Sequence, residues 1–423
     1  MAEAALIDMD AAAPPVKATR FQIGAVVAGN ALEFYDFLTF SFFAVDIGQA
    51  FFPSKDSFGS LLASLATFWV GFLTRPIGAF VIGRMGDRVG RKPAMLLCFA
   101  LMGLAIVGMA VTPGYAQIGL AAPVIVVALR LLQGFALGGQ VGPSTAFLIE
   151  AASPPRRGVM ISLQYLGQGL STFSAGAIGV VLAATLAPPA FHAFGWRIAL
   201  AIGALIVPTG LILRNGLAET LHGAEPQPTT AAARPAVRGL AIAFVMLSAT
   251  TIITYVLNYI TSYATVTLKM PANVAFAATM VRGLGVLIGA VLGGWLADRV
   301  GRRPVMVWPG ALLLLLTVPS FWWLGELRTA ANLFGLIFML SVVSAVSSTA
   351  ALVWITESMP KASRSTSLAL TYAIAISIFG GSAQFNVAWL THATGNPLAP
   401  AWYMTVAGAV GLIAMFAANE TRP

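Results

Sequence analysis

The chain has 423 residues, of which 58% are hydrophobic and only 9% are charged, and its formal net charge is +9. Soluble domains carry about 25% charged residues, so this composition excludes a soluble globular enzyme, a disordered chain and a coiled coil. A polytopic membrane protein is the class that remains. The single cysteine and the three scattered histidines predict neither a disulfide framework nor a metal site.

Twelve stretches are apolar and long enough to cross a bilayer, because a spanning helix needs about 20 apolar residues. They are 22–45, 58–83, 94–112, 118–149, 159–186, 197–214, 239–267, 273–297, 304–324, 331–356, 365–391 and 400–418. A polar stretch rich in Pro, Ala and Thr separates six spans from six. We therefore predict an all-α membrane protein with six-helix bundles at 22–214 and 239–418. The tails at 1–21 and 419–423 and the central linker at 215–238 are expected to be cytoplasmic.

The 24 lysines and arginines fall mainly on one side of these spans. With both termini inside, 17 lie in cytoplasmic segments, 4 in outer segments and 3 within spans. Such a bias is the positive-inside pattern of membrane proteins. It explains the basic charge without nucleic-acid binding, and it predicts a multi-pass protein of the cell membrane, in bacteria the inner membrane.

One loop sequence occurs twice, each time after the second span of a half. Residues 83–93 read GRMGDRVGRKP and residues 294–304 read GWLADRVGRRP, 211 positions apart. After each fourth span, a glutamate precedes an arginine by seven residues. Parallel duplication is typical of two-bundle transporters that work by alternating access. We expect these loops to gate that motion, although they could serve topology alone. The expected gating residues are Gly83, Asp87, Arg88, Gly90, Arg91, Glu150, Arg157, Asp298, Arg299, Gly301, Arg302, Glu357 and Arg364.

The duplicated loop resembles the signature of the major facilitator superfamily, and the chain is similar to that superfamily over nearly its whole length. Further strings resemble one branch of it, the metabolite:proton symporters, which carry citrate, tricarballylate, 2-oxoglutarate, shikimate, or proline and betaine. They are GNALEFYDF at 29–37, RPIG at 75–78, RLLQGF at 130–135, GWRI at 195–198 and IFGG at 378–381. The resemblance implies two bundles around a central cavity and proton-coupled transport, and we expect no cofactor.

Five ionisable residues lie inside the expected spans, where a charge costs about 2.5–3.5 kcal/mol to insert. They are Glu33, Asp36, Arg75, Arg130 and Arg282, and three guanidiniums against two carboxylates leave a net charge of +1. A carboxylate in a partly dry cavity can exchange a proton near neutral pH. Asp36 and Glu33 are therefore the expected proton-coupling residues. Arg75 lies at a similar depth to Glu33 and is its expected partner, although that pair could be purely structural.

In the fold that the resemblance implies, spans 4 and 8 belong to opposite halves and line the cavity. Arg130 and Arg282 lie about 14 Å deep in these spans by the helical rise, so each guanidinium could bind one carboxylate of a substrate. Arg130 could instead join two helices, and Arg282 could extend to the membrane surface. Further expected ligands lie on polar stripes, which also serve in helix packing. They are Asn30, Gln133, Gln140, Gln164, Gln168, Tyr255 and Asn258.

One departure from the resembling branch bears on the substrate. That branch usually carries a glutamate where this chain has Gln140, so the cavity is expected to be more positive. We therefore predict a proton-coupled symporter, not an enzyme, for a small organic anion such as citrate or another di- or tricarboxylate. A zwitterion such as proline or betaine, shikimate, uniport, and sodium coupling stay alternatives, as does a membrane sensor without net transport. The expected partners are the anion, protons and bilayer lipid, and we expect a monomer.

Overall fold

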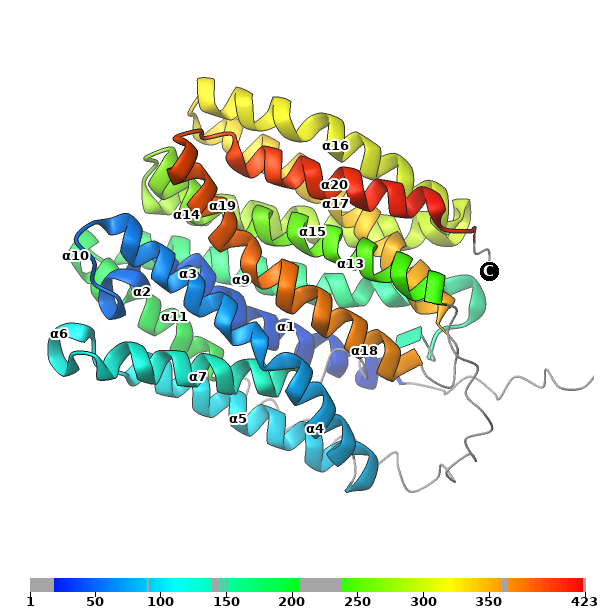
Figure 1. Cartoon of the computed structure of the whole chain (residues 1–423), viewed down its shortest axis with the longest axis horizontal. Coiled ribbons are helices and arrows are strands. Elements are labelled where there is room, and N and C mark those ends of the chain that lie inside the picture. Colours follow the sequence, from blue (N-terminus) through cyan, green and yellow to red (C-terminus); the bar gives the residue numbers. More distant parts are fainter. Residues whose placement is uncertain are drawn as a thin grey trace, which may run out of the picture.

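The structure is a computed structural model that describes residues 19–89, 91–138, 145, 148–149, 151–205, 237–359 and 364–420. Within these ranges the regular elements are all helical. We call the described residues up to 205 the N-half and those from 237 the C-half, and Figure 1 shows the C-half mostly above the N-half. The expected linker lies almost wholly outside the described residues, so the domain boundaries stay predictions.

The N-half contains ten α-helices among its described residues and a break in the second expected span. Pro76 has no N–H to donate, so the helical hydrogen-bond ladder is interrupted near Thr74. At the other end of this span the Asp56 side chain accepts a hydrogen bond from the Gly59 N–H at 2.9 Å and caps the helix. The helices are α1 (Arg20–Phe42), α2 (Ala44–Phe51), α3 (Ser57–Leu73), α4 (Arg75–Arg88), α5 (Arg91–Val111), α6 (Tyr115–Ile118), α7 (Ala121–Gly138), α9 (Arg157–Thr185), α10 (Pro188–Ala190) and α11 (Trp196–Gly203).

The C-half contains eight α-helices among its described residues and two π-helical turns, which are frequent at functional sites. Its helices are α13 (Val237–Asn258), α14 (Ile260–Ser262), α15 (Ala272–Val300), α16 (Arg302–Glu326), α17 (Ala330–Ser358), α18 (Arg364–Ala375), α19 (Gly381–Thr394) and α20 (Ala399–Ala417). The π-helical turn η4 (Tyr263–Thr267) follows α14, and η6 (Ile376–Gly380) joins α18 to α19. The span expected at 365–391 is thus helical with a π-helical turn in the middle.

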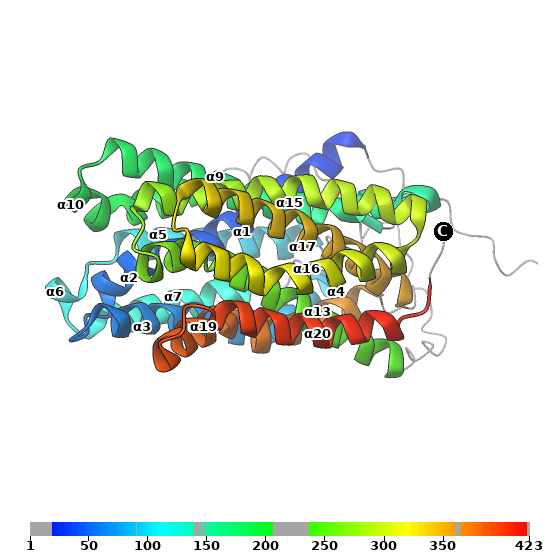
Figure 2. The same cartoon turned by 90° about the horizontal axis from the view of Figure 1, so that it is seen from above.

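The outer surface is apolar, as a lipid environment requires. Nine helical segments within the described ranges are long and apolar enough to cross a membrane. Figures 1 and 2 show the long helices running side by side along the longest axis. Trp308 and Leu315 on α16 and Ile413 on α20 are about 70% exposed, at 73%, 71% and 69%. The count of twelve spans and the cytoplasmic position of both termini stay predictions.

The two halves meet along two pairs of helices. Helix α9 lies against α15 over much of its length, and α3 lies against α19. Glycines allow the close approach of α9 and α15. A Cβ atom at Gly294 would lie only 2.5 Å from the carbonyl oxygen of Gly158. This seam runs directly to the end of the molecule that carries the duplicated loop.

Candidate functional site

A cavity lies between the halves. It is lined by α1 and α9 of the N-half and by α13, α15, α17, α18 and η6 of the C-half. Gln168, Tyr255, Asn258 and Arg282, four of the expected ligands, are in its wall. Arg282 is the one charged side chain among the described residues that line it. The free volume is about 40 Å³, room for about three water molecules, so a citrate-sized molecule would need the halves to separate.

Arg282 is held at the cavity wall with hydrogen-bonding capacity to spare. Its side chain is 3% exposed, and its Nη2 atom donates to the backbone carbonyl of Thr254 at 3.0 Å. Its Nε atom has no hydrogen-bond partner among the described residues. A guanidinium presents five N–H donors in a planar fork that matches a carboxylate. Arg282 therefore faces the cavity and does not extend to the membrane surface.

Arg130 lies elsewhere, in a buried group with Gln133 and Asp36. Arg130 donates to the Gln133 side-chain oxygen, and the Gln133 amide donates in turn to the Asp36 carboxylate. All three side chains are fully buried. Asp36 Oδ1 and two guanidinium nitrogens of Arg130 have no hydrogen-bond partner among the described residues. A neutral amide thus joins a buried acid to a buried cation, and a carboxylate oxygen is left open to a proton.

Four aromatic rings pack on the guanidiniums of Arg130 and of Arg75 on α4. We call these rings, those of Phe37, Phe40, Phe68 and Phe72, the phenylalanine cage. The Arg130 guanidinium carbon lies 4.4 Å from the ring centres of both Phe37 and Phe40 and 5.1 Å from that of Phe68. The guanidinium of Arg75 lies 4.6 Å from the Phe37 ring and 4.3 Å from the Phe72 ring. Cation–π attraction of this kind compensates part of the hydration that a buried guanidinium loses. Phe37 therefore attracts both positive charges.

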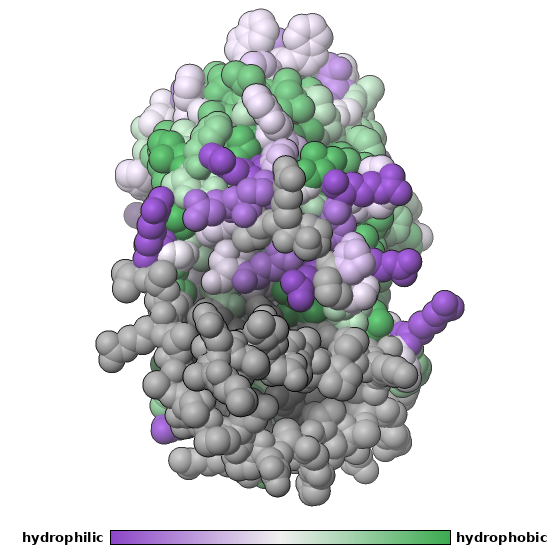
Figure 3. Space-filling view, turned by 90° about the vertical axis from the view of Figure 1, so that its right-hand side faces the viewer, coloured by the Kyte–Doolittle hydropathy of each residue, from purple (hydrophilic) through white to green (hydrophobic). Residues whose placement is uncertain are grey.

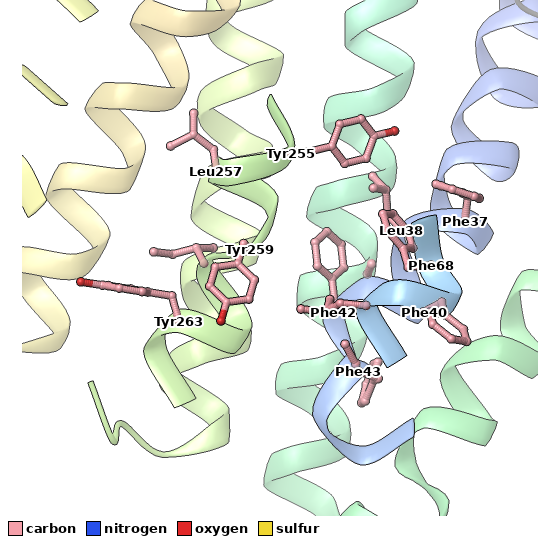
Figure 4. Close-up of a cluster of buried hydrophobic side chains, with 14 of the residues drawn as sticks. Phe37, Leu38, Phe40, Phe42, Phe43, Phe68, Tyr255, Leu257, Tyr259 and Tyr263 are labelled. Atoms are coloured by element: carbon pink, nitrogen blue, oxygen red, sulfur yellow. The ribbon is translucent and has the colours of Figure 1, made fainter. Parts of the chain in front are cut away.

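Tyr255 connects the cavity to the cage. It lines the cavity, and its ring centre lies 5.5 Å from that of Phe72 and 6.0 Å from that of Phe68. Figure 4 shows Tyr255 projecting from α13 toward Phe37 and Leu38 on α1. The cavity and the buried group of Asp36 thus share one aromatic wall.

The remaining expected residues of α1 take other positions. Asn30 and Gln164 pair with each other: Asn30 Nδ2 donates to the Gln164 carbonyl at 2.9 Å, and Gln164 Nε2 donates to Asn30 Oδ1 at 3.2 Å. They join α1 to α9 and do not line the cavity. Glu33 is buried, at 2% exposure, and is close enough to act electrostatically on Arg75. Gln140 lies outside the described residues.

The second copy of the duplicated loop joins the two halves at one end of the bundle. We call it the arginine-rich end, because it carries Arg157, Arg299, Arg302 and Arg303. The Asp298 carboxylate accepts hydrogen bonds from the N–H groups of Gly158 at 2.7 Å and Val159 at 3.0 Å, at the start of α9. A carboxylate is favourable at a helix N-terminus. Arg157 and Glu357 add an ion pair at 3.8 Å between the same halves. Figure 3 views this end and shows hydrophilic residues gathered on it.

Arg302 organises the loop that holds Asp298. It is fully buried, donates to both Glu357 oxygens at 3.1 and 3.0 Å, and lies 3.4 Å from the Asp298 carboxylate. Gly301 has a φ of +112°, which only glycine adopts without strain. Glu420 accepts hydrogen bonds from the Arg302 N–H at 2.9 Å and the Arg303 N–H at 3.2 Å. The segment that follows α20 therefore braces the second loop.

The first copy of the loop is only partly described. Gly83 lies within α4, and the Arg299 guanidinium of the second copy stacks on Trp295 at 4.3 Å. Gly90 and Glu150 lie outside the described residues, as do the side chains of four further expected gating residues. These four are Asp87, Arg88, Arg91 and Arg364.

Other contacts join the halves away from the arginine-rich end. The Trp69 indole on α3 donates to the Ser377 carbonyl at 2.9 Å, and the Ser377 hydroxyl donates to the Phe72 carbonyl at 2.7 Å. Ser41 donates to Gln384 at 2.6 Å, from α1 to α19. Contacts between the halves therefore lie on both sides of the cavity.

Two features of the site were not expected from the sequence. The phenylalanine cage has a signal in the repeated Phe residues at 34–43 and 68–72, which read as ordinary apolar filling of a span. The sequence signal for Glu420 is a short repeat. AET at 218–220 follows the sixth expected span, and NET at 419–421 follows the twelfth.

Comparisons with known proteins agree with this architecture. A family model described as the Major Facilitator Superfamily matches residues 26–384. A citrate-proton symporter of Salmonella typhi is 33% identical over 396 residues, which cover 92% of this chain and 91% of that protein. An alpha-ketoglutarate permease of Escherichia coli is 34% identical, with 93% of each chain covered. A proline/betaine transporter of Escherichia coli is 30% identical, covering 95% of this chain and 84% of the relative.

The fold has solved counterparts. The structure of the proton:xylose symporter XylE bound to 6-bromo-6-deoxy-D-glucose superposes with a TM-score of 0.76 at 17% identity, covering 95% of this chain and 96% of that one. The all-α membrane fold expected from the sequence is thereby confirmed.

Proposed function

The chain belongs to the major facilitator superfamily, and on that premise we propose that it is a secondary active transporter that carries a small organic anion together with protons by alternating access. The observation that carries the proposal is the charge of the cavity. Arg282 is the one charged side chain in the described lining, and it keeps free donors. A buried, uncompensated guanidinium favours an anionic ligand.

We infer that Asp36 is the residue that binds the coupled proton. Its carboxylate is fully buried and has one oxygen without a partner among the described residues. Its link to the Arg130 charge runs through the neutral amide of Gln133. Binding a proton at Asp36 would remove the negative charge of this group and leave Arg130 to its aromatic neighbours. The proton gradient can then shift the populations of the protonated and deprotonated states of this group.

The substrate of the proposal is a di- or tricarboxylate such as citrate or 2-oxoglutarate, which the names of two relatives support. Arg282 would bind one carboxylate through paired hydrogen bonds, aided by Gln168 and Tyr255. Arg282 lines the cavity and Arg130 does not, so we assign Arg130 to the proton site. A zwitterion is less well matched, because no carboxylate lines the described cavity to receive an ammonium group.

The test is uptake by purified protein in liposomes with an imposed pH gradient, with labelled citrate and labelled 2-oxoglutarate. Wild-type protein should accumulate at least one of them. Asp36→Asn should abolish accumulation driven by the gradient and retain exchange of labelled for unlabelled substrate. The matched control is Asp46→Asn, another buried aspartate of the N-half, which pairs with His192 at 2.6 Å. Full accumulation by Asp36→Asn would refute the proton site, and uptake unaffected by Arg282→Ala would refute the anion site.

A further inference from the structure

Three polar atoms in the cavity wall have no hydrogen-bond partner among the described residues. They are Arg282 Nε, Asn258 Oδ1 and Ser341 Oγ. Their side chains are 3%, 2% and 1% exposed, so each is withdrawn from bulk water. A buried polar atom without a partner costs about 1–3 kcal/mol. These atoms come from α15, α13 and α17, all in the C-half.

Three threonine hydroxyls of the same wall are satisfied within the protein. The Thr250 hydroxyl donates to the Met246 carbonyl at 2.9 Å, and the Thr251 hydroxyl to the Leu247 carbonyl at 2.8 Å. Thr172 donates to the Gln168 carbonyl at 3.0 Å. Threonine side chains in helices commonly bond the carbonyl group four residues earlier in this way. The three unpartnered atoms therefore differ from these threonines in having no bond within the protein.

The three side chains belong to one neighbourhood. Arg282 Nη2 bonds the carbonyl of Thr254, one helical turn before Asn258 on α13. Ser341 packs on α15 one turn beyond Arg282, where a Cβ atom at Gly285 would lie 2.9 Å from the Ser341 Cβ. Arg282 is thus bonded to the helix that carries Asn258, and its own helix packs against Ser341.

The chemistry of these atoms limits the ligand that can satisfy all of them. Arg282 Nε is a donor and Ser341 Oγ can donate or accept, so both can bind a carboxylate. Asn258 Oδ1 can only accept, and an ionised carboxylate has no hydrogen to give it. The ligand must therefore bring a donor as well as a carboxylate.

We propose that the cavity selects a hydroxycarboxylate, whose carboxylate binds Arg282 and Ser341 and whose hydroxyl donates to Asn258. This proposal rests on the anion transport proposed above and names Asn258 as the residue that reads the hydroxyl. An ammonium donor is excluded by the positive charge of Arg282 and by the lack of a carboxylate among the described lining residues. A protonated carboxyl group is the other possible donor, and the test below separates it from a hydroxyl.

The experiment compares two ligand pairs on purified protein. Citrate and tricarballylate differ only by the hydroxyl group, and so do malate and succinate. Binding is measured by calorimetry at neutral pH. We expect the hydroxylated member of at least one pair to bind ten- to a hundredfold more tightly, because a site left with an unpaired buried acceptor loses affinity by that order. Asn258→Leu should bring the two affinities within about twofold of each other. The control Asn386→Leu, at a residue outside the cavity that donates to Tyr403 at 3.1 Å, should keep the difference.

The outcomes separate this inference from the function on which it rests. Equal binding of both members of each pair by wild-type protein would overturn the hydroxyl assignment and leave anion transport standing. Tighter binding of tricarballylate or succinate that grows as the pH falls would identify a protonated carboxyl group as the donor and also overturn it. Failure of all four acids to bind, with no uptake of citrate or 2-oxoglutarate, would refute the proposed function itself. The wild-type comparison needs no variant, so a misfolded Asn258→Leu protein would not prevent the decision.

Discussion

The contact between Asp298 and the start of α9 offers a direct test of gating. In Asp298→Asn one carboxylate oxygen becomes an NH2 group, so one of the two hydrogen bonds to Gly158 and Val159 is lost, together with the negative charge at the helix N-terminus. A hydrogen bond to a charged group contributes about 1.5–3 kcal/mol. Both bonds cross from one half to the other, so the loss falls on the state in which the arginine-rich end is closed. The open state should gain population by roughly 10- to 150-fold.

The assay is a distance measurement between spin labels at that end. The one cysteine, Cys98, is buried and is replaced by serine, and cysteines are introduced at the exposed positions Ser153 and Val300. The wild-type pair should show mainly the short distance of the closed end. Asp298→Asn should move most of the distribution to a longer distance.

The control removes the same kind of cap where it does not cross the halves. Asp56 caps its own helix α3, so Asp56→Asn should weaken that helix and leave the distance distribution at the arginine-rich end unchanged. An unchanged distribution in Asp298→Asn would refute the reasoning. So would an equal shift in Asp56→Asn, because the effect would then reflect general loosening of the fold.

Three further variants test other contacts. Ser377→Ala removes a hydrogen bond between the halves on the other side of the cavity, so it should shift the same distance distribution toward the short, closed component; a shift toward longer distances would contradict this. Phe37→Leu removes the ring that contacts both Arg75 and Arg130 and should lower the unfolding free energy by about 2 kcal/mol, read as a drop in the thermal midpoint of purified protein; an unchanged midpoint would count against the cage. Glu420→Gln weakens the brace on the second loop and should lower the thermal midpoint by a few degrees, and a midpoint equal to that of wild type would remove the bracing role.

The membrane helices were the most predictable part of the molecule. Residues 273–297 were expected to span, and α15 occupies Ala272–Val300, because a long apolar run bounded by charges has few other solutions in lipid. The break near Thr74 was not expected, although Pro76 was visible in the sequence. Proline predicts a lost hydrogen bond, but neighbouring helices decide whether the helix bends or separates into two.

Several residues of the site were predicted from the sequence, but not which of them contact one another. Arg130 and Arg282 were placed at similar depth from the helical rise, but depth along a helix does not fix the direction in which a side chain points. Arg130 lies among phenylalanine rings and bonds Gln133, whereas Arg282 faces the cavity. The link from Gln133 to Asp36 joins residues 97 positions apart, and no local pattern in the chain encodes such a contact.

The arrangement of the two charged groups explains how one could influence the other without touching it. Tyr255 lines the cavity and its ring is nearly perpendicular to that of Phe72, at 83°, and Phe72 in turn packs on the guanidinium of Arg75. Interiors are close-packed and transmit displacement, so a ligand that moves Tyr255 must move the cage or be resisted by it. The net charge of the group of Asp36, Gln133 and Arg130 beside the cage depends in turn on whether Asp36 carries a proton. Proton and substrate binding are then coupled if protonated Asp36 and an occupied cavity favour the same arrangement of the aromatic residues between them.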